Sequence, residues 1–261
     1  MAEDTAKVTA DEHIPTNLRL LRLLEEVAKA GTPVTPSGVN DALGLPKPTL
    51  HRLFHTAEQE GFLQRDLDGR SYSPGRRLRH LAVDTLSSER VRTVRIAVLR
   101  SIVDAVGETC NIAIADRDGM YYLDRIESAW PLRIAMPVGT IVPFHCTASG
   151  KLYLSSLRPD YLDRYLRNAP LEGHTRNTVT DPAGLKSGMA QIRANGYSVD
   201  DEEYMEGMCA IAVPVKSDQG RLLCTLSIHA PTQRQSVRDL MQHLDRLIDG
   251  AVELASVVSE A

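Results

Sequence analysis

The 261-residue sequence has few aromatic residues, few cysteines and no long apolar run. Three Phe, one Trp and eight Tyr do not decide whether a binding pocket would prefer aliphatic or aromatic ligands. With no signal peptide and no apolar run near the ~20 residues of a membrane span, we expect a cytoplasmic protein without a membrane segment. The four cysteines form no C-x-x-C pair, which is typical of reduced thiols rather than a disulfide framework. They are Cys110, Cys146, Cys209 and Cys224.

Charge is divided unevenly along the chain, although the net charge is only −4. Residues 16–103 carry fourteen Lys and Arg against nine Asp and Glu, a net charge of +5. Residues 1–15 carry −3, which leaves −6 for residues 104–261. A basic front and an acidic back fit a DNA-binding head joined to a domain that does not bind DNA. The polar, acidic residues 1–13 predict a disordered tail.

The stretch from Thr35 to Tyr72 has the pattern of a helix-turn-helix followed by a wing. Thr35 and the proline after it suit the start of a short helix, and Gly44 suits its end. Asp68-Gly69 suits the tight turn of a hairpin, and a support helix is expected to precede these elements and to end at Gly31. The second helix of the motif has apolar residues at helical spacing, namely Leu50, Leu53, Phe54 and Ala57.

The exposed N-terminal end of that second helix is the expected DNA-reading surface, because this end enters the major groove in helix-turn-helix proteins. Arg can pair with guanine, and Thr can contact a thymine methyl group or a phosphate. Arginines beside the wing turn can reach phosphates or the minor groove. A solvated helix face and an ordinary exposed hairpin are the alternatives. The candidate DNA-binding residues are Lys47, Thr49, His51, Arg52, Arg65 and Arg70.

The remaining chain predicts a linker helix and an α+β domain. Apolar residues keep helical spacing over 76–106, which predicts one long helix with a role in dimerisation and with Arg95 on a solvated or interdomain face. From Gly107 onward, strand patterns alternate with helices, and an antiparallel sheet bracketed by helices is an α+β domain. The expected strands include 111–115, 132–136 and 210–215. The predicted organisation is therefore a winged helix-turn-helix over 14–75, the linker over 76–106 and the α+β domain over 107–261.

Taken together, these motifs resemble the IclR family of transcriptional regulators over about residues 14–258. The resemblance implies a winged head, a linker helix and a GAF-like effector-binding domain. It also implies a homodimer, or a dimer of dimers, on palindromic double-stranded operator DNA, and control of catabolic genes. The residues that carry it are Gly44 to Leu53 in the head and, in the back domain, His145 to Lys151, Gly196-Tyr197, Asp200 to Glu203 and Ser227 to Pro231.

The resemblance places effector contacts at the start of a helix after Thr147 and on nearby strands. Thr147 can cap this helix, whose free amides suit a carboxylate, and Lys151 is expected to form an ion pair at the domain surface. His229 stands where many members have a small hydroxyl residue. It could shrink the cavity and add a donor or a positive charge, or it could be a satisfied, partly buried histidine. The mapped effector-binding residues are Ala148, Ser149, Asp201, Cys209, Ala210, Ser227 and His229.

Other chemistry has weaker support in the sequence. Ser149-Gly150-Lys151 is not a P-loop, because Leu152 stands where Ser or Thr is required. Cys146 with His145 and His229 would resemble a thiol nucleophile with a base, but neighbours on a strand point to opposite faces. Zinc could bind His145, Cys146, Cys209 or His229, although no metal-ligand spacing is present.

We therefore expect an effector-responsive DNA-binding regulator, a repressor in preference to an activator, with a small carboxylic acid as effector. We expect no catalytic residue, no cofactor and no metal. The alternative is a sensor or enzyme that binds a small molecule or zinc through the back domain.

Overall fold

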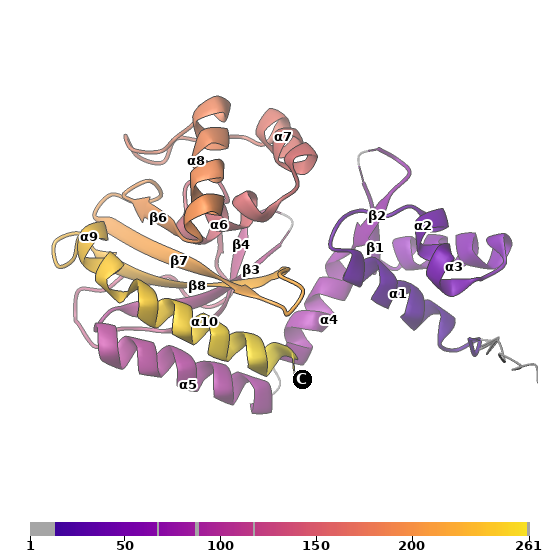
Figure 1. The fold of residues 1–261 in the computed structure, drawn as a ribbon, viewed down its shortest axis with the longest axis horizontal. Helices are drawn as coiled ribbons and strands as arrows, with labels where there is room; N and C mark the ends of the chain where they lie inside the picture. Colours follow the sequence, from indigo (N-terminus) through magenta and orange to yellow (C-terminus); the bar gives the residue numbers. More distant parts are fainter. Residues whose placement is uncertain (1–13, 67, 87–88, 117, 260–261) are drawn as a thin grey trace, which may run out of the picture. The chain divides into compact units, whose positions relative to one another are not determined.

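The structure is a computed structural model that describes residues 14–259 except 67, 87–88 and 117 (Figure 1). The predicted tail over residues 1–13 lies outside the described residues. Contacts divide the chain between Asp84 and Thr85 into two compact units. We call them the head unit and the back unit and describe each by itself.

The head unit contains helices followed by a two-stranded antiparallel hairpin, as the sequence predicts. Its core joins Leu23 and Val27 of the first helix to Phe54 and Ala57 of the third, and Tyr72 closes the hairpin against them. The elements in chain order are α1 (Arg19–Ala30), α2 (Pro36–Leu43), α3 (Lys47–Gln59), β1 (Leu63–Arg65), β2 (Tyr72–Pro74) and α4 (Arg76–Leu86).

The turn between α2 and α3 is held by local hydrogen bonds that follow from the residue types. Thr35 caps α2 by accepting the Gly38 amide at 3.3 Å. Gly44 ends the helix in the left-handed region, at a φ of 61°, where a residue with a Cβ would be strained. Asn40 then accepts the Leu45 amide at 2.9 Å and donates to the Leu45 carbonyl at 3.0 Å. These bonds fix where α3 begins, and thereby which residues its N-terminal end exposes.

The back unit is built on one antiparallel sheet in the strand order β5-β4-β3-β8-β7-β6. Its strands are β3 (Thr109–Ala115), β4 (Met120–Ile126), β5 (Ile141–Val142), β6 (Ser198–Asp201), β7 (Met208–Lys216) and β8 (Leu222–Pro231). Its helices are α5 (Glu89–Val106), α6 (Ala148–Ser156), α7 (Pro159–Asn168), α8 (Pro182–Asn195), α9 (Val237–Leu240), the 3-10 helix η1 (Met241–His243) and α10 (Leu244–Ser259).

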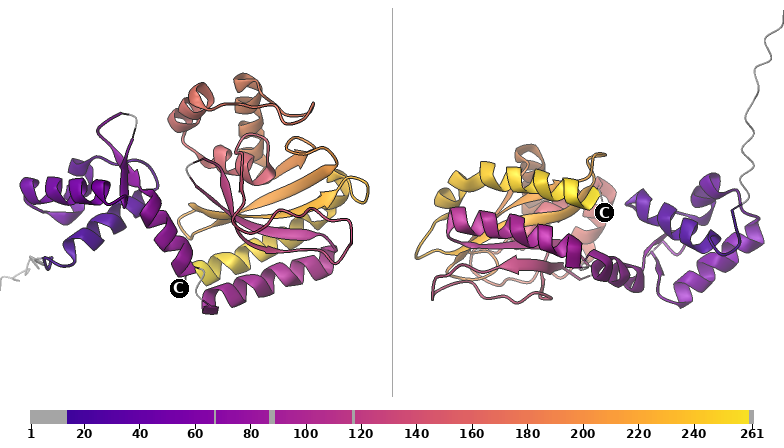
Figure 2. Two further views of the ribbon diagram at one scale, coloured as in Figure 1. Left: turned by 180° about the vertical axis from the view of Figure 1, so that it is seen from behind. Right: turned by 90° about the horizontal axis from the view of Figure 1, so that it is seen from below.

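Helices cover both faces of this sheet. In Figures 1 and 2, α5 and α10 lie side by side on one face, and both contact the strands beneath them. Helices α6, α7 and α8 lie on the opposite side, with α6 packed directly on β7 and β8. Strands β3, β7 and β8 therefore present alternate residues to two different helical layers.

The described residues of the helix predicted over 76–106 lie in α4 and α5, and residues 87–88 between them lie outside the described part. One expectation differs from the structure. Residues 132–136 form no strand, because Pro131 and Pro137 bracket the segment and the Ile134 carbonyl accepts a hydrogen bond from Arg125 instead of a neighbouring strand.

Two arginines of α5 differ in exposure, although Arg95 was expected on a solvated or interdomain face. Arg92 is 55 % exposed, whereas Arg95 is only 2 % exposed and binds the buried carboxylate of Asp124 on β4. Among the described residues, no helix combines the length and the apolar character that crossing a bilayer requires.

Candidate functional site

The exposed end of α3 carries the side chains expected to read DNA. Leu50, Phe54 and Ala57 are buried in the head core, which turns the opposite side of α3 outward. Lys47, His51 and Arg52 are exposed there, and Thr49 is half-buried. The first two turns of α3 thus present two cations, an imidazole and a hydroxyl on one surface of the head unit.

The two wing arginines have different environments. The Arg65 guanidinium binds both oxygens of Glu58 on α3, at 3.0 and 2.8 Å, and stacks over the Tyr72 ring. Its hydrogen bond lowers the pKa of the Glu58 carboxyl. Arg70 is exposed beside the turn, where Asp68 accepts its backbone amide. Arg65 therefore attaches the wing to α3, whereas the Arg70 side chain makes no such contact with α3 within the described part of the head unit.

The start of α6 has the predicted cap and lies unusually close to the preceding chain. Thr147 accepts the Gly150 amide at 3.1 Å and donates to the Pro143 carbonyl at 2.7 Å. A Cβ on Gly150 would lie 2.5 Å from the Cα of Phe144, so only glycine fits this approach. Ala148 and Ser149 are buried, at 1 % and 3 % exposure, at the N-terminal end of the helix.

The sheet brings three of the other predicted effector residues to the layer beneath α6. Ala210 on β7 packs with Ala148 of α6. Ala210 pairs directly with His229 on β8, and directly opposed residues share a face. Ser227 lies two residues before His229 and therefore points to the same side. All three are at most 4 % exposed.

Cys209 and Asp201 are not brought to this layer. Each is one residue from a position that faces α6, and the two pair with each other across β6 and β7. The Cys209 thiol instead contacts the Gln235 carbonyl at 3.1 Å, and Asp201 is exposed. Asp200, the partner of Ala210, faces α6 and is 1 % exposed. The acidic residue that faces α6 is therefore Asp200, one position before the predicted Asp201.

His229 is buried and neutral. Its Nε2 lies 3.0 Å from the Ser227 hydroxyl, and its ring meets the Tyr122 ring edge to face at 6.1 Å between centroids. Burial, and to a lesser extent the charge of Arg125, lower the pKa of His229 to about 3. Near neutral pH this histidine can therefore offer a hydrogen bond but no positive charge.

The positive charge in this layer comes from Arg125, which the sequence analysis did not single out. Arg125 on β4 is 9 % exposed and pairs directly with Asn111 on β3, which in turn pairs with Ser227. It donates to the Asn111 side-chain oxygen at 3.0 Å. Burial lowers the pKa of this guanidinium, yet arginine stays protonated at neutral pH. Two adjacent charged residues, Asp124 and Arg125, in a strand of otherwise apolar and aromatic residues were the available signal.

Several polar atoms in this layer are buried without a hydrogen bond among the described residues. Such atoms are rare in folded proteins and each is costly unless a partner is supplied. Burial raises the pKa of Asp200 to about 7, although its Oδ1 accepts the Glu203 amide at 2.8 Å. Together with the Arg125 guanidinium, the unpaired polar atoms of this layer could bind a small polar anion. These atoms are Asn111 Nδ2, Ser149 Oγ, Asp200 Oδ2 and His229 Nδ1.

Lys151 forms the predicted ion pair, but the pair is not at the surface. Its ammonium binds the Glu203 carboxylate, and both residues are less than a tenth exposed. Burial raises the pKa of Glu203, while the Lys151 charge lowers it. Lys151 therefore joins α6 to the segment after β6.

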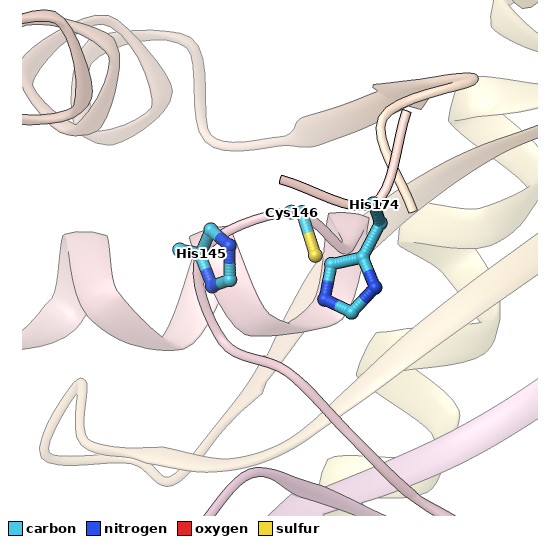
Figure 3. A group of neighbouring side chains, drawn as sticks. All are labelled: His145, Cys146 and His174. Atoms are coloured by element: carbon cyan, nitrogen blue, oxygen red, sulfur yellow. The ribbon is translucent and has the colours of Figure 1, made fainter. Parts of the chain in front are cut away.

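A second cluster lies just before α6. One ligand atom from each of His145, Cys146 and His174 lies within 4.8 Å of the others, and Figure 3 shows the Cys146 sulfur between the two rings. Cys209 and His229, which were considered as zinc ligands, are not in this group. All four cysteines are free and buried. Burial raises the pKa of Cys146 to about 12, so its thiol stays protonated, contrary to the needs of a nucleophile.

Comparison with known proteins agrees with this architecture. The model of the IclR helix-turn-helix domain matches residues 18–67, and that of the bacterial transcriptional regulator IclR C-terminal domain matches residues 83–256. The probable transcriptional regulator SauR of Cupriavidus necator is 35% identical over 243 residues, which cover 93% of this chain and 96% of the relative.

Two further relatives are similar to this chain over most of their length. The acetate operon repressor of Salmonella typhimurium is 29% identical over 235 residues, 89% of this chain and 85% of that protein. The crystal structure of an IclR homolog from Microbacterium hydrocarbonoxydans complexed with 4-hydroxybenzoate has a TM-score of 0.60 at 26% identity, covering 95% of this chain and 100% of that one. The chain therefore belongs to the IclR family of transcriptional regulators, and it is a DNA-binding regulator and not an enzyme.

Proposed function

We propose that this regulator is an effector-responsive repressor of catabolic genes whose effector is a small carboxylic acid bound beneath the start of α6. The observation that carries the effector class is the buried Arg125 guanidinium, which shares one layer with Asn111 and Ser227. A buried cation surrounded by unsatisfied donors and acceptors favours an anionic ligand, because such a ligand would supply the missing partners.

The helix start adds a second source of positive potential. Backbone amides in the first turn of a helix carry a partial positive charge that stabilises a carboxylate. Ala148 and Ser149 lie in that turn, above the strands that hold Ala210, Ser227 and His229. Guanidinium, amides and hydroxyls would then contact one carboxylate from different sides, and Asp200 could accept or, when protonated, donate a hydrogen bond to a hydroxyl of the same ligand.

Relatives support the direction of regulation and the ligand class. One similar protein is the acetate operon repressor, and a similar solved structure holds 4-hydroxybenzoate. Both names involve carboxylic acids. We propose a homodimer, or a dimer of dimers, because a two-fold symmetric protein reads two half-sites of a palindromic operator. In this proposal residues 14–75 bind DNA, 76–106 connect the units and 107–261 bind the effector.

On the DNA side, we propose that Lys47, Thr49, His51 and Arg52 enter the major groove and that Arg70 reaches the backbone from the wing. Arg65 is the weaker candidate, since its guanidinium is already bound to Glu58. Releasing it would break charge-assisted hydrogen bonds that hold the wing. Its replacement should lower affinity indirectly, through the position of the wing.

Arg52→Ala is expected to lower operator affinity by ~1–3 kcal/mol, roughly five- to 150-fold, if Arg52 makes a bidentate base contact. Fluorescence anisotropy at fixed salt measures this change. Arg22→Ala is the matched control, because Arg22 is an exposed arginine of α1 in the same unit. Equal losses in both variants would indicate a general basic surface, and unchanged affinity in Arg52→Ala would remove Arg52 from the base-reading set.

The effector site is tested by comparing adjacent residues. Asp200→Asn and Ser227→Ala are expected to weaken the release of DNA by the active acid at least ~tenfold, while Asp201→Asn should not, because Asp201 is exposed on the other face. The probes are acetate, a four-carbon dicarboxylate and 4-hydroxybenzoate, and the readout is operator binding against acid concentration. Sensitivity to Asp201→Asn together with insensitivity to Asp200→Asn would show that the effector contacts Asp201, as the sequence predicts, and not Asp200.

A further inference from the structure

We propose that His145, Cys146 and His174 form a binding site for a thiophilic transition-metal ion, Zn²⁺ in the first instance. Two of these residues precede α6, and the third lies 28 residues further along the chain, before α8. None of the three is among the residues proposed to bind the effector, so the existence of the metal site does not depend on the proposed effector.

The spacing of the three ligand atoms fits a metal centre after a small adjustment. The atoms lie within 4.8 Å of one another, and ligands of a tetrahedral zinc ion are about 3.5 Å apart, given Zn–S and Zn–N bonds of about 2.3 and 2.0 Å. His145 and Cys146 are buried, at 2 % and 0 % exposure, whereas His174 is exposed. An ion could therefore reach the group from solvent on the side of the exposed His174.

Hydrogen bonding prepares His145 as a ligand. Its Nε2 lies 2.9 Å from the Glu172 carbonyl oxygen, which can only accept, so Nε2 carries the proton. The lone pair is then on Nδ1, and a carbonyl that orients the second nitrogen is the usual outer partner of a metal-bound histidine. The His174 ring packs against the Tyr204 ring at 5.3 Å between centroids.

Metal binding requires the Cys146 sulfur as a thiolate. The reaction replaces the thiol proton by the metal: Zn²⁺ and the protonated thiol give the Zn-thiolate and one released proton, with no change of oxidation state. Three protein ligands leave the fourth position to water.

A bound metal ion would stabilise the segment that follows His174, which is otherwise attached to the back unit by hydrogen bonds. Thr175 and Thr178 donate to the carbonyls of Glu202 and Glu203, each at 2.6 Å. A metal bound by His174 would fasten this segment directly to the start of α6. The ion should accordingly raise the thermal unfolding midpoint of the full-length protein.

The test is titration of the full-length, chelator-treated protein with Co²⁺, followed by competition with Zn²⁺. We expect one equivalent of Co²⁺ per chain to produce thiolate-to-cobalt charge-transfer absorption that Zn²⁺ abolishes. Cys146→Ser should remove the absorption. His174→Ala should weaken binding by more than ~tenfold, since even outer partners of metal ligands contribute that much. Cys224→Ala, the buried-thiol control on β8, should keep the absorption.

Circular dichroism of each variant separates loss of ligand from loss of fold. His174 is exposed, so His174→Ala should fold and its metal affinity can be measured even if a substitution of a buried ligand unfolds the chain. Absence of thiolate absorption in the folded wild-type protein would overturn the proposal. Absorption that survives in folded Cys146→Ser, or unchanged affinity in His174→Ala, would overturn it equally.

Discussion

Arg125→Gln is expected to lower effector affinity at least ~100-fold, about 3 kcal/mol, and to leave operator binding without effector unchanged. The reason is that Arg125 is a buried cation facing the layer beneath α6. Glutamine can still donate to the Asn111 oxygen that Arg125 now contacts. It cannot offer a carboxylate either a charge or a bidentate donor pair. The measurement is release of labelled operator DNA as the active acid is titrated.

Arg133→Gln is the matched control for that experiment. Arg133 binds Glu127, the same carboxylate that lies 3.5 Å from Arg125 Nε, but it is 41% exposed. Its loss removes a neighbouring charge of the same kind without changing the buried layer. Equal loss of response in both variants would mean that general electrostatics, and not a contact of Arg125, governs the effector. A normal response in Arg125→Gln would exclude this site.

Arg95→Ala is expected to destabilise the back unit by ~3–5 kcal/mol, because it leaves the carboxylate of Asp124 buried without its main partner. Arg95 Nε and Nη2 both lie 2.7 Å from Asp124 Oδ2, and both side chains are at most 2% exposed. Arg92 binds the other oxygen of the same carboxylate at 3.1 Å but is 55% exposed. Urea unfolding followed by circular dichroism measures the effect.

Arg92→Ala is the internal control for this comparison and should cost at most ~1 kcal/mol, as exposed ion pairs do. Both arginines belong to α5 and share one acceptor, so the difference in unfolding free energy between the two variants reports the effect of burial. Similar small losses in the two variants would show that the Arg95 pair is not a principal support of the α5 layer. A large loss in Arg92→Ala alone would reverse the roles assigned to them.

The head unit could be predicted closely from the sequence because its signals are local. The Thr35 cap, the Gly44 end and the apolar spacing of α3 each depend on a few neighbouring residues. The back unit depends on register, and a shift of one residue moves a side chain to the opposite face of a strand. This explains why Asp201 was chosen where Asp200 faces α6, and why Cys209 was included beside Ala210, although only Ala210 faces α6.

The residues that the sequence analysis missed depend on contacts between distant segments. Arg125 meets Asn111 and Ser227 only because β4, β3 and β8 are neighbours in the sheet, although β8 is about a hundred residues away in the chain. His174 similarly approaches Cys146 through the path of the chain between α7 and α8. No spacing rule within one segment contains this information, so it required the three-dimensional structure.

The most direct test of the central claim is selection of bound duplexes from a random DNA library at fixed salt, repeated with each acid of the panel. We expect an enriched palindrome whose half-sites are spaced for a dimer, and we expect one acid to reduce its recovery. Enrichment that no carboxylic acid changes would contradict the proposed effector class. Binding without any enriched sequence, steeply weakened by salt, would contradict sequence-specific reading by α3.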